Sequence, residues 1–457
     1  MNELRMDYSN LLSEQIGEEG VTLEEWERNK ERAQRLWWSL QEKRSRGDLP
    51  FLDLPYMDFG EQVQKVSQEI KGGFDPLILL GIGGSCLGTR AILEALFPPF
   101  FQIDGRVGEK GPRVFLLDNI DPSIIAYVLE RAKEGDPLVV VVSKSGRTAE
   151  TLSQFIFFLR LLKERWPSSW KERLLIVTDP DKGPLRRFAK EEGVVALPFP
   201  RGVEGRFSVL SPVGLLPAAL LGVKIEQLLL GAVEMDRAMK QEGEENPVLF
   251  SAYLHYLLHI TKGKGQWITM PYSDALGGVA AWRRQLVAES LGKRKDLAPT
   301  PSSAVGTTDQ HSQLQLWLDG PRDKIVAFLT IEDRKNDPII PPSEWQQEEV
   351  EHLQGKGIGS LLDAERRSTE YSLTIAGCPN YTITLRPGPK ALGMLFYFWE
   401  VEVTLLGYLY GVDPFGQPAV EEGKRVAAAL MGKKGLEGKG KEWEKWRKRR
   451  REWLWPK

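Results

Sequence analysis

The sequence predicts an α/β protein of two domains, each built on a mainly parallel sheet flanked by helices. The chain has 457 residues, which is too long for one ordinary hydrophobic core and favours two domains of similar size. In the first half, short apolar runs alternate with longer helical patterns, as is typical of a doubly wound parallel sheet. A second unit of the same class starts near Trp267–Met270. We therefore expect two α/β domains in one chain.

The elements of the first half can be predicted in order. Residues 1–53 look helical and charged, and we expect them to wrap around the rest of the chain rather than form a domain. Helical patterns at Ala91–Leu96 and Thr148–Leu162 indicate helices of the first domain, which we expect over 54–245. Its strands are expected at Leu77–Leu80, Val114–Leu117, Leu138–Val142, Leu174–Val177 and Val194–Leu197.

The second half is predicted to hold a second domain over 246–431 and a tail over 432–457. The pattern is helical from about Ser211 to Pro247, and the clearest later strand is Ile325–Thr330. In open parallel sheets, ligands bind outside the carboxyl ends of the strands. The loops that follow the predicted strands are therefore the expected positions of functional residues.

Charge is unevenly distributed along the chain. Residues 432–457 carry eleven Lys/Arg and four Glu, which leaves the remainder at a net charge of -9. A body that acidic repels nucleic acid, so we expect no nucleic-acid partner. The tail places Trp443, Trp446, Trp453 and Trp455 among basic residues, a pattern that also suits anionic lipid or nucleic acid. We expect a helix that packs these tryptophans on the body.

Cellular location is predicted from cysteine usage and from apolar segments. The two cysteines, Cys86 and Cys378, are too few for a disulfide scaffold, and the N-terminus shows no apolar leader. We therefore expect a cytoplasmic protein. The apolar segment Ala391–Val412 is long enough to cross a bilayer, but Glu400 and Glu402 lie at its middle. Acidic groups there cost about 2.5 to 3.5 kcal/mol each on insertion, which favours a buried helix and no membrane partner.

A glycine-rich loop follows the first predicted strand and leads into a helix. It reads Gly-Ile-Gly-Gly-Ser-Cys-Leu-Gly-Thr over 81–89, with Gly84 and Ser85 at its centre. Glycines bring backbone N–H groups close to an anion, and a helix N-terminus adds partial positive charge. The loop lacks the lysine of a Walker motif and the spacing of a dinucleotide fingerprint. It predicts a phosphate site, and close packing alone is the alternative explanation.

A second polar loop follows the third predicted strand. Ser143, Lys144, Ser145 and Thr148 stand within six residues at a strand-to-helix junction. The alternative explanation is helix capping, with Glu150 completing a capping box, but capping accounts for one hydroxyl only. Two such loops at adjacent strand ends suit one phosphate held from two sides.

Candidate acid–base residues appear in the second half. The segment 280–292 reads as a helix that ends at Gly292, and Gln285 and Glu289 share one of its faces. Glu289 beside an amide is a candidate general base, whereas a solvated glutamate near a helix end is the alternative. His311 is expected in the first turn of another helix. The pair His255 and His259 has the spacing of two zinc ligands, but no third ligand accompanies them, so we expect surface or packing histidines and no metal.

These motifs together resemble the phosphoglucose isomerase family. Four blocks occur in the family's order: the Gly-Ile-Gly-Gly-Ser loop, the Ser-Lys-Ser-x-x-Thr loop, the Gln-Leu-x-x-Glu-Ser helix with Thr-Asp-Gln-His-Ser, and Gln-x-x-Val-Glu-x-Gly-Lys ending at Lys424. The resemblance implies two sugar isomerase (SIS) domains, aldose–ketose isomerisation of glucose 6-phosphate and fructose 6-phosphate through an enediolate, no cofactor, and a homodimer with shared active sites.

The resemblance also implies a role for each matching residue. Glu289 would move the proton between C1 and C2, and Arg206, which follows Gly205, would stabilise the enediolate. His311 and Lys424 would open the sugar ring. Gln285 and Gln417 would position the hydroxyls of the sugar. The phosphate would be held by Gly84, Ser85, Ser143, Lys144, Ser145 and Thr148.

Several positions depart from the family's pattern. Glu204 stands where a glycine is common, Ser145 replaces a common threonine, Gly416 replaces a common aspartate and Ala419 a common glycine. None of them removes a proposed catalytic group. Two other functions remain open at this point: a sugar-phosphate sensor that needs no base, and a related isomerase acting on mannose 6-phosphate or an amino-sugar phosphate.

Overall fold

The computed structural model describes residues 3–70, 73–97, 107, 111–241, 245–334, 336–345 and 347–450. The chain forms two compact units, residues 1–414 and 415–457, which we describe separately. The first unit contains two five-stranded sheets.

The first sheet is entirely parallel and has the strand order β3-β2-β4-β5-β6. Four predicted strands are confirmed within a residue at each end. The fifth begins two residues later than predicted, because Gly193 ends the preceding helix in a left-handed conformation and Val194 serves as the connection. The strands are β2 (Leu77–Leu80), β3 (Val114–Leu117), β4 (Leu138–Ser143), β5 (Leu174–Thr178) and β6 (Ala196–Pro198).

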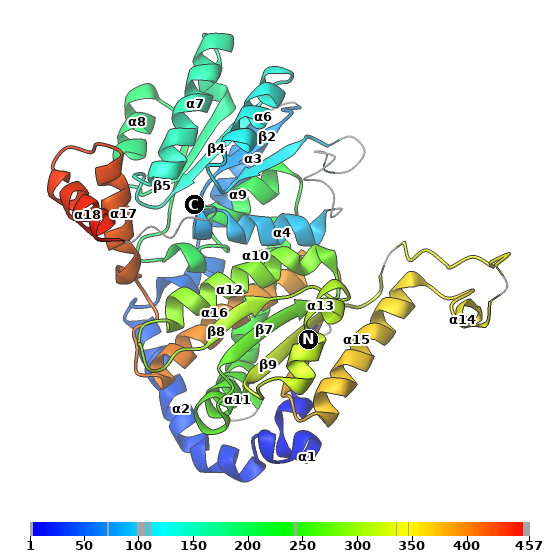
Figure 1. The fold of residues 1–457 in the computed structure, drawn as a ribbon. Coiled ribbons are helices and arrows are strands. Elements are labelled where there is room, and N and C mark those ends of the chain that lie inside the picture. The colour runs from blue at the N-terminus through cyan, green and yellow to red at the C-terminus, as the bar shows by residue number, and fades with distance from the viewer. Residues whose placement is uncertain are drawn as a thin grey trace. The chain divides into compact units, whose positions relative to one another are not determined.

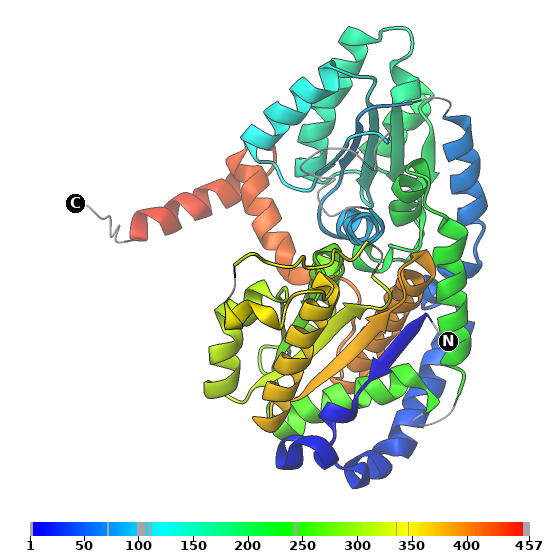
Figure 2. The same ribbon diagram turned by 90° about the vertical axis from the view of Figure 1, so that its right-hand side faces the viewer.

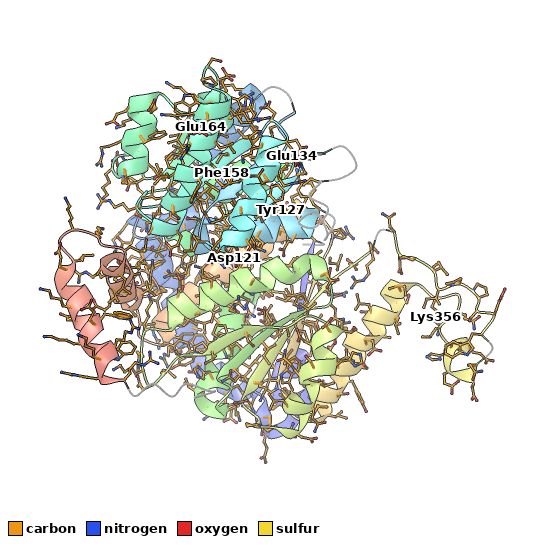
Figure 3. The ribbon with its side chains drawn as sticks, turned by 45° about the horizontal axis from the view of Figure 1, so that its top comes forward. Asp121, Tyr127, Glu134, Phe158, Glu164 and Lys356 are labelled. Atoms are coloured by element: carbon orange, nitrogen blue, oxygen red, sulfur yellow. The ribbon has the colours of Figure 1, made fainter. Side chains whose placement is uncertain are left out.

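Helices cover both faces of this sheet. One face packs against α6 (Pro122–Lys133), α7 (Ala149–Arg165) and α8 (Pro184–Glu192), whose apolar side chains share a core with the strands. Phe158 of α7, labelled in Figure 3, is fully buried in this core. Figure 2 shows α3 (Phe59–Glu69) on the opposite side of the sheet. The region predicted as helical after the sheet contains α9 (Pro212–Leu220) and α10 (Ile225–Ala238).

The second sheet has the order β1-β10-β9-β7-β8, with β1 antiparallel and the other pairs parallel. The prediction of a purely helical N-terminal segment is wrong at β1, where Leu4 pairs with Leu385 and Asp7 with Thr382. Figure 2 shows this strand beside β10 at the sheet edge. The strands are β1 (Leu4–Asp7), β7 (Gln266–Pro271), β8 (Thr300–Ser303), β9 (Lys324–Ile331) and β10 (Asn380–Leu385).

Helices also flank the second sheet. Trp317 of α13 (Thr308–Asp319) and Leu373 of α15 (Ile358–Ile375) share a core with β7 and β9. The predicted architecture of mainly parallel sheets between helices is thereby confirmed. In the described part of this unit the other α-helices are α1 (Ser13–Ile16), α2 (Leu23–Ser45), α4 (Leu87–Leu96), α11 (Pro247–Lys262), α12 (Gly277–Leu291), α14 (Glu348–Glu351) and α16 (Pro389–Leu409).

Helix α16 is the apolar segment that resembles a membrane span. Within the described residues it alone is long and apolar enough for one, and 94% of its most apolar 18-residue window is buried inside the molecule. It packs against α10, α11 and α12. Glu400 and Glu402 are buried with it. The prediction of a buried core helix is confirmed.

An arm projects from the second sheet. Residues 336–345 and 347–357 carry α14 and extend away from the body in Figure 1 and in Figure 3, which labels Lys356. Ile340 N donates to Lys356 O, which pairs the two sides of the arm. Ile339 and Trp345 expose 61% and 65% of their surface.

The second unit consists of a short 3-10 helix, Pro418–Val420, followed by α17 (Glu421–Leu430) and α18 (Glu437–Arg449). An ion pair of 2.8 Å between Lys439 and Glu422 joins the two α-helices. The expected tail helix is therefore present. Trp453 and Trp455 lie outside the described residues, and the packing of the tail on the body stays a prediction.

Candidate active site

The glycine loop after β2 lies very close to two other segments that hold predicted site residues. It forms a 3-10 turn, Gly83–Ser85, in which Gly83 has a φ of +56°. A Cβ on Gly84 would lie 2.3 Å from the backbone of Gly205, and one on Gly83 would lie 2.9 Å from the Gln285 side chain. Close approach of the backbone therefore requires glycine at position 84, and the positive φ favours it at position 83. The residues that are brought close are themselves predicted site residues. The close packing of this loop therefore also brings the predicted site residues together.

The hydroxyl loop after β4 does not cap its helix. Thr148 is the N-cap residue of α7, but its side chain makes no capping hydrogen bond. Its hydroxyl lies 3.1 Å from that of Ser143, and the Ser145 hydroxyl accepts from Arg147 N at 3.2 Å. Capping is thus the wrong explanation for Thr148. Two hydroxyls at a helix N-terminus face each other beside Lys144, an arrangement that can bind an anion.

Arg206 is the most deeply buried charged group of the site. It lies in a 3-10 turn, Gly205–Phe207, and its side chain is 1% exposed. Nε donates to Ser290 Oγ at 2.7 Å, Nη1 to Glu289 Oε2 at 3.1 Å and Nη2 to Pro414 O at 2.5 Å. Burial lowers the pKa of the guanidinium, and the charge of Glu289 opposes this shift. A guanidinium stays protonated in proteins, so Arg206 supplies a fixed cation.

Helix α12 presents Gln285 and Glu289 on one face, as predicted. Gln285 Nε2 donates to Glu289 Oε1 at 3.0 Å, while Arg206 binds the other carboxylate oxygen. The Glu289 side chain is 34% exposed, unlike its arginine partner. A freely solvated glutamate, the alternative explanation, does not match a carboxylate held at both oxygens. The carboxylate is oriented by a hydrogen bond at each oxygen and is still partly exposed.

The three predicted site residues that remain are placed less directly. His311 is exposed in the first turn of α13, and within the described residues no hydrogen bond joins its ring to the other site residues. Gln417 and Lys424 belong to the second unit, where Lys424 Nζ lies 2.7 Å from Glu421. Their approach to Glu289 stays a prediction.

The histidine pair on α11 packs in the core. The His255 ring contacts Trp267 and Tyr381, and His259 lies 2.7 Å from the Tyr410 hydroxyl. Burial lowers the pKa of both imidazoles. These contacts agree with the prediction of packing residues. Within the described ranges, no three His, Cys, Asp or Glu side chains gather as a metal site.

Sequence reasoning missed three groups at the site. Ser290 accepts from Arg206, and its position next to Glu289 in the helix motif was a usable signal. The Pro414 carbonyl carries no side-chain signal, since any residue supplies a backbone oxygen. Lys293 lies close enough to the site that burial and the charge of Arg206 lower its pKa.

Comparisons with known proteins agree with this geometry. The family model described as phosphoglucose isomerase matches residues 57–340. A glucose-6-phosphate isomerase of Carboxydothermus hydrogenoformans is 38% identical over 96% of this chain and 97% of its own. One of Rubrobacter xylanophilus is 40% identical over 95% and 99%. A solved structure of a hypothetical protein from Thermus thermophilus superimposes with a TM-score of 0.84 at 35% identity, covering 94% of this chain and 99% of that one.

The family match and the geometry concern the same residues. The matched region includes both anion loops, Arg206 and the α12 pair, and the full-length relatives extend the match across the segment that ends at Lys424. The resemblance inferred from four short motifs is thereby confirmed: this chain belongs to the phosphoglucose isomerase family.

Proposed function

We propose that this protein interconverts glucose 6-phosphate and fructose 6-phosphate in glycolysis and gluconeogenesis, with Glu289 as the base. The observation that carries the proposal is the Glu289 carboxylate, which is held by Gln285 and Arg206 beside two anion-binding loops. A sugar-phosphate sensor would need the loops but not this oriented carboxylate.

Binding starts at the phosphate in this mechanism. The backbone amides of Gly84 and Ser85 and the Lys144 ammonium bind the phosphate, together with the hydroxyls of Ser143, Ser145 and Thr148. Charge-assisted hydrogen bonds of this kind are about twice as strong as neutral ones. Anchoring the phosphate fixes the distance to C1 and C2 at the other end of the open chain, where Glu289 can reach their protons.

Proton transfer follows once the ring is open. Glu289 removes the proton from C2 of the aldose and returns it to C1, while the enediolate oxygen takes up negative charge. Arg206 already holds its orientation through Ser290 and Pro414, so it stabilises this charge with little reorganisation. His311 and Lys424 act on the ring oxygen and the C1 hydroxyl. Gln285 and Gln417 orient the remaining hydroxyls.

A homodimer with shared sites completes the proposal. The arm over 336–345 and 347–357 exposes Trp345 and Ile339, large apolar side chains of the kind that second copies cover. His311 is exposed in the single chain, as expected for a residue that serves a partner's site. We place the protein in the cytoplasm, without cofactor, nucleic-acid or membrane partners.

A coupled assay with purified protein, glucose 6-phosphate and EDTA tests the reaction. Sustained formation of fructose 6-phosphate supports the proposal. Tight binding without turnover would favour the sensor, and turnover of mannose 6-phosphate at a higher kcat/KM would reassign the substrate.

Subunit complementation tests the shared site. Glu289→Gln and His311→Ala variants, each inactive as homodimers, are unfolded together and refolded. If each site takes Glu289 from one subunit and His311 from the other, statistical mixing restores about a quarter of the wild-type activity. No restoration, although mixed dimers are present by mass, would place both residues in one subunit.

A further inference from the structure

Lys144 of the hydroxyl loop forms an ion pair that the proposed mechanism does not use. Lys144 Nζ lies 2.8 Å from Glu204 Oε2. The glutamate side chain is 19% exposed and the lysine side chain 42%. Glu204 directly precedes the Gly205–Phe207 turn, and its carbonyl accepts from Phe207 N at 3.0 Å. The backbone of Glu204 is therefore fixed beside the site, and its carboxylate is paired with Lys144.

This carboxylate and a substrate phosphate need the same cation. Lys144 is the one ammonium in the hydroxyl loop, and the adjoining Ser143 and Thr148 hydroxyls lie 3.1 Å apart. A phosphate bound there meets either a lysine already neutralised by Glu204 or a nearby negative charge. Both situations weaken phosphate binding, because like charges repel and the lysine can satisfy only one of the two anions fully.

We propose that Glu204 is an affinity-setting residue that competes with the substrate phosphate for Lys144. Binding exchanges one anion for another on the same ammonium: the phosphate takes Lys144, and the Glu204 carboxylate turns to solvent. The inference rests on the phosphate site of the proposed function. It adds to that function a lower affinity for the substrate phosphate than a chain with glycine at the same position would have.

The competition acts on binding rather than on the chemical step. Lys144 binds the phosphate end of the substrate, whereas Arg206 and Glu289 act at the other end. The charge of Glu204 also reaches Arg206, where it favours the protonated guanidinium. The guanidinium of Arg206 is charged with or without Glu204. Removing the charge of Glu204 should therefore leave kcat nearly unchanged.

The test measures KM for glucose 6-phosphate and the inhibition constant of inorganic phosphate in wild type and Glu204→Gln. We expect both constants to fall by about three- to thirtyfold in the variant, with kcat within a factor of about two. Glu150→Gln, a like change in the first turn of α7 without an ion pair to Lys144, is the matched control and should move both constants much less.

A double-mutant cycle shows whether Glu204 acts through Lys144. In a Lys144→Met background, Glu204→Gln should change the inhibition constant of phosphate much less than it does when Lys144 is present. Equal constants for wild type and Glu204→Gln in an active enzyme would overturn the inference and leave the isomerase intact. Absence of isomerase activity would overturn the proposed function, and calorimetric titration of inorganic phosphate into the same variants would still decide the role of Glu204.

Discussion

Helix α12 contributes one residue to each of two arginine–glutamate pairs that have opposite surroundings. Glu289 pairs with Arg206 at the candidate site, and Arg283 lies 3.7 Å from Glu402 in the core. The first carboxylate is 34% exposed, whereas both members of the second pair are 3% exposed or less. The same two side-chain types therefore occur at a partly exposed site and in a closed interior.

The partners differ as much as the exposure. Arg283 donates to Thr269 and Tyr381 at 2.9 Å each and stacks over Trp399 at 4.8 Å. Ser251 donates to the other oxygen of Glu402. Such a pair leaves no side open to a substrate. A carboxylate can serve as a base only where it is both oriented and accessible. Glu289 meets both conditions, whereas Glu402 is oriented but not accessible.

The largest expected effect breaks the site pair. Glu289→Gln keeps the shape and removes the proton acceptor, so kcat should fall by about 10⁴-fold with KM nearly unchanged. The glutamine oxygen can still accept from Arg206, so urea unfolding should show a smaller loss of stability than breaking the core pair. Glu402→Gln is the matched control: the folded enzyme should retain most of its kcat. Near-normal turnover by Glu289→Gln would remove it from the role of base.

The next effect breaks the core pair. Arg283→Met leaves Glu402 buried without its cation, and the free energy of unfolding should fall by about 3 to 5 kcal/mol. Chemical denaturation measures this loss. An Arg283→Met, Glu402→Met double variant should recover much of the stability, since no charge is left unpaired. Equal stability of Arg283→Met and wild type would mean that the pair contributes nothing to the core.

A pH series sharpens the comparison with a third glutamate, Glu400, which shares α16 with Glu402. Glu400 is fully buried, neither carboxyl oxygen has a hydrogen-bond partner among the described residues, and burial raises its pKa well above 4.5. The folded state therefore keeps its proton after the unfolded chain has lost it. This stability is complete below about pH 4.5 and is lost as the pH rises towards the raised pKa.

Glu400→Gln removes that titration. The stability of wild type relative to the variant should decrease with rising pH above 4.5, by at most about 1.4 kcal/mol per pH unit. Parallel urea titrations between pH 4 and 8 measure the difference. A constant difference would show that Glu400 titrates normally.

The smallest effect is expected outside both pairs. Deleting residues 432–457 removes the basic tail but no proposed site residue, so kcat and KM should change by less than about twofold. The melting temperature reports any packing that is lost. Salt-sensitive binding of RNA or anionic vesicles that disappears with the tail would contradict the expected packing role.

The two pairs also differ in how much of each could be predicted from the sequence. Glu289 and Gln285 could be predicted because both stand on one helix face in a motif with known chemistry. Arg283 stands on the same helix and Glu402 in the apolar segment of α16, but nothing in the sequence paired them, since their contact depends on how α12 crosses α16. Strands β2 to β5 were predictable from short apolar runs, whereas β1 was not, because its partner strand lies at the far end of the chain.

The sequence by itself determined the class of fold, and it predicted the two polar loops and the candidate base and cation. Apolar periodicity, glycine spacing and hydroxyl-rich junctions are local properties, and local properties can be recognised in one dimension. The tertiary structure decided that Glu204 binds Lys144, that Gly84 meets Gly205, and that Ser290 and Pro414 orient Arg206. These contacts join residues far apart in the chain, and only packing sets the distances on which hydrogen bonds and charges depend.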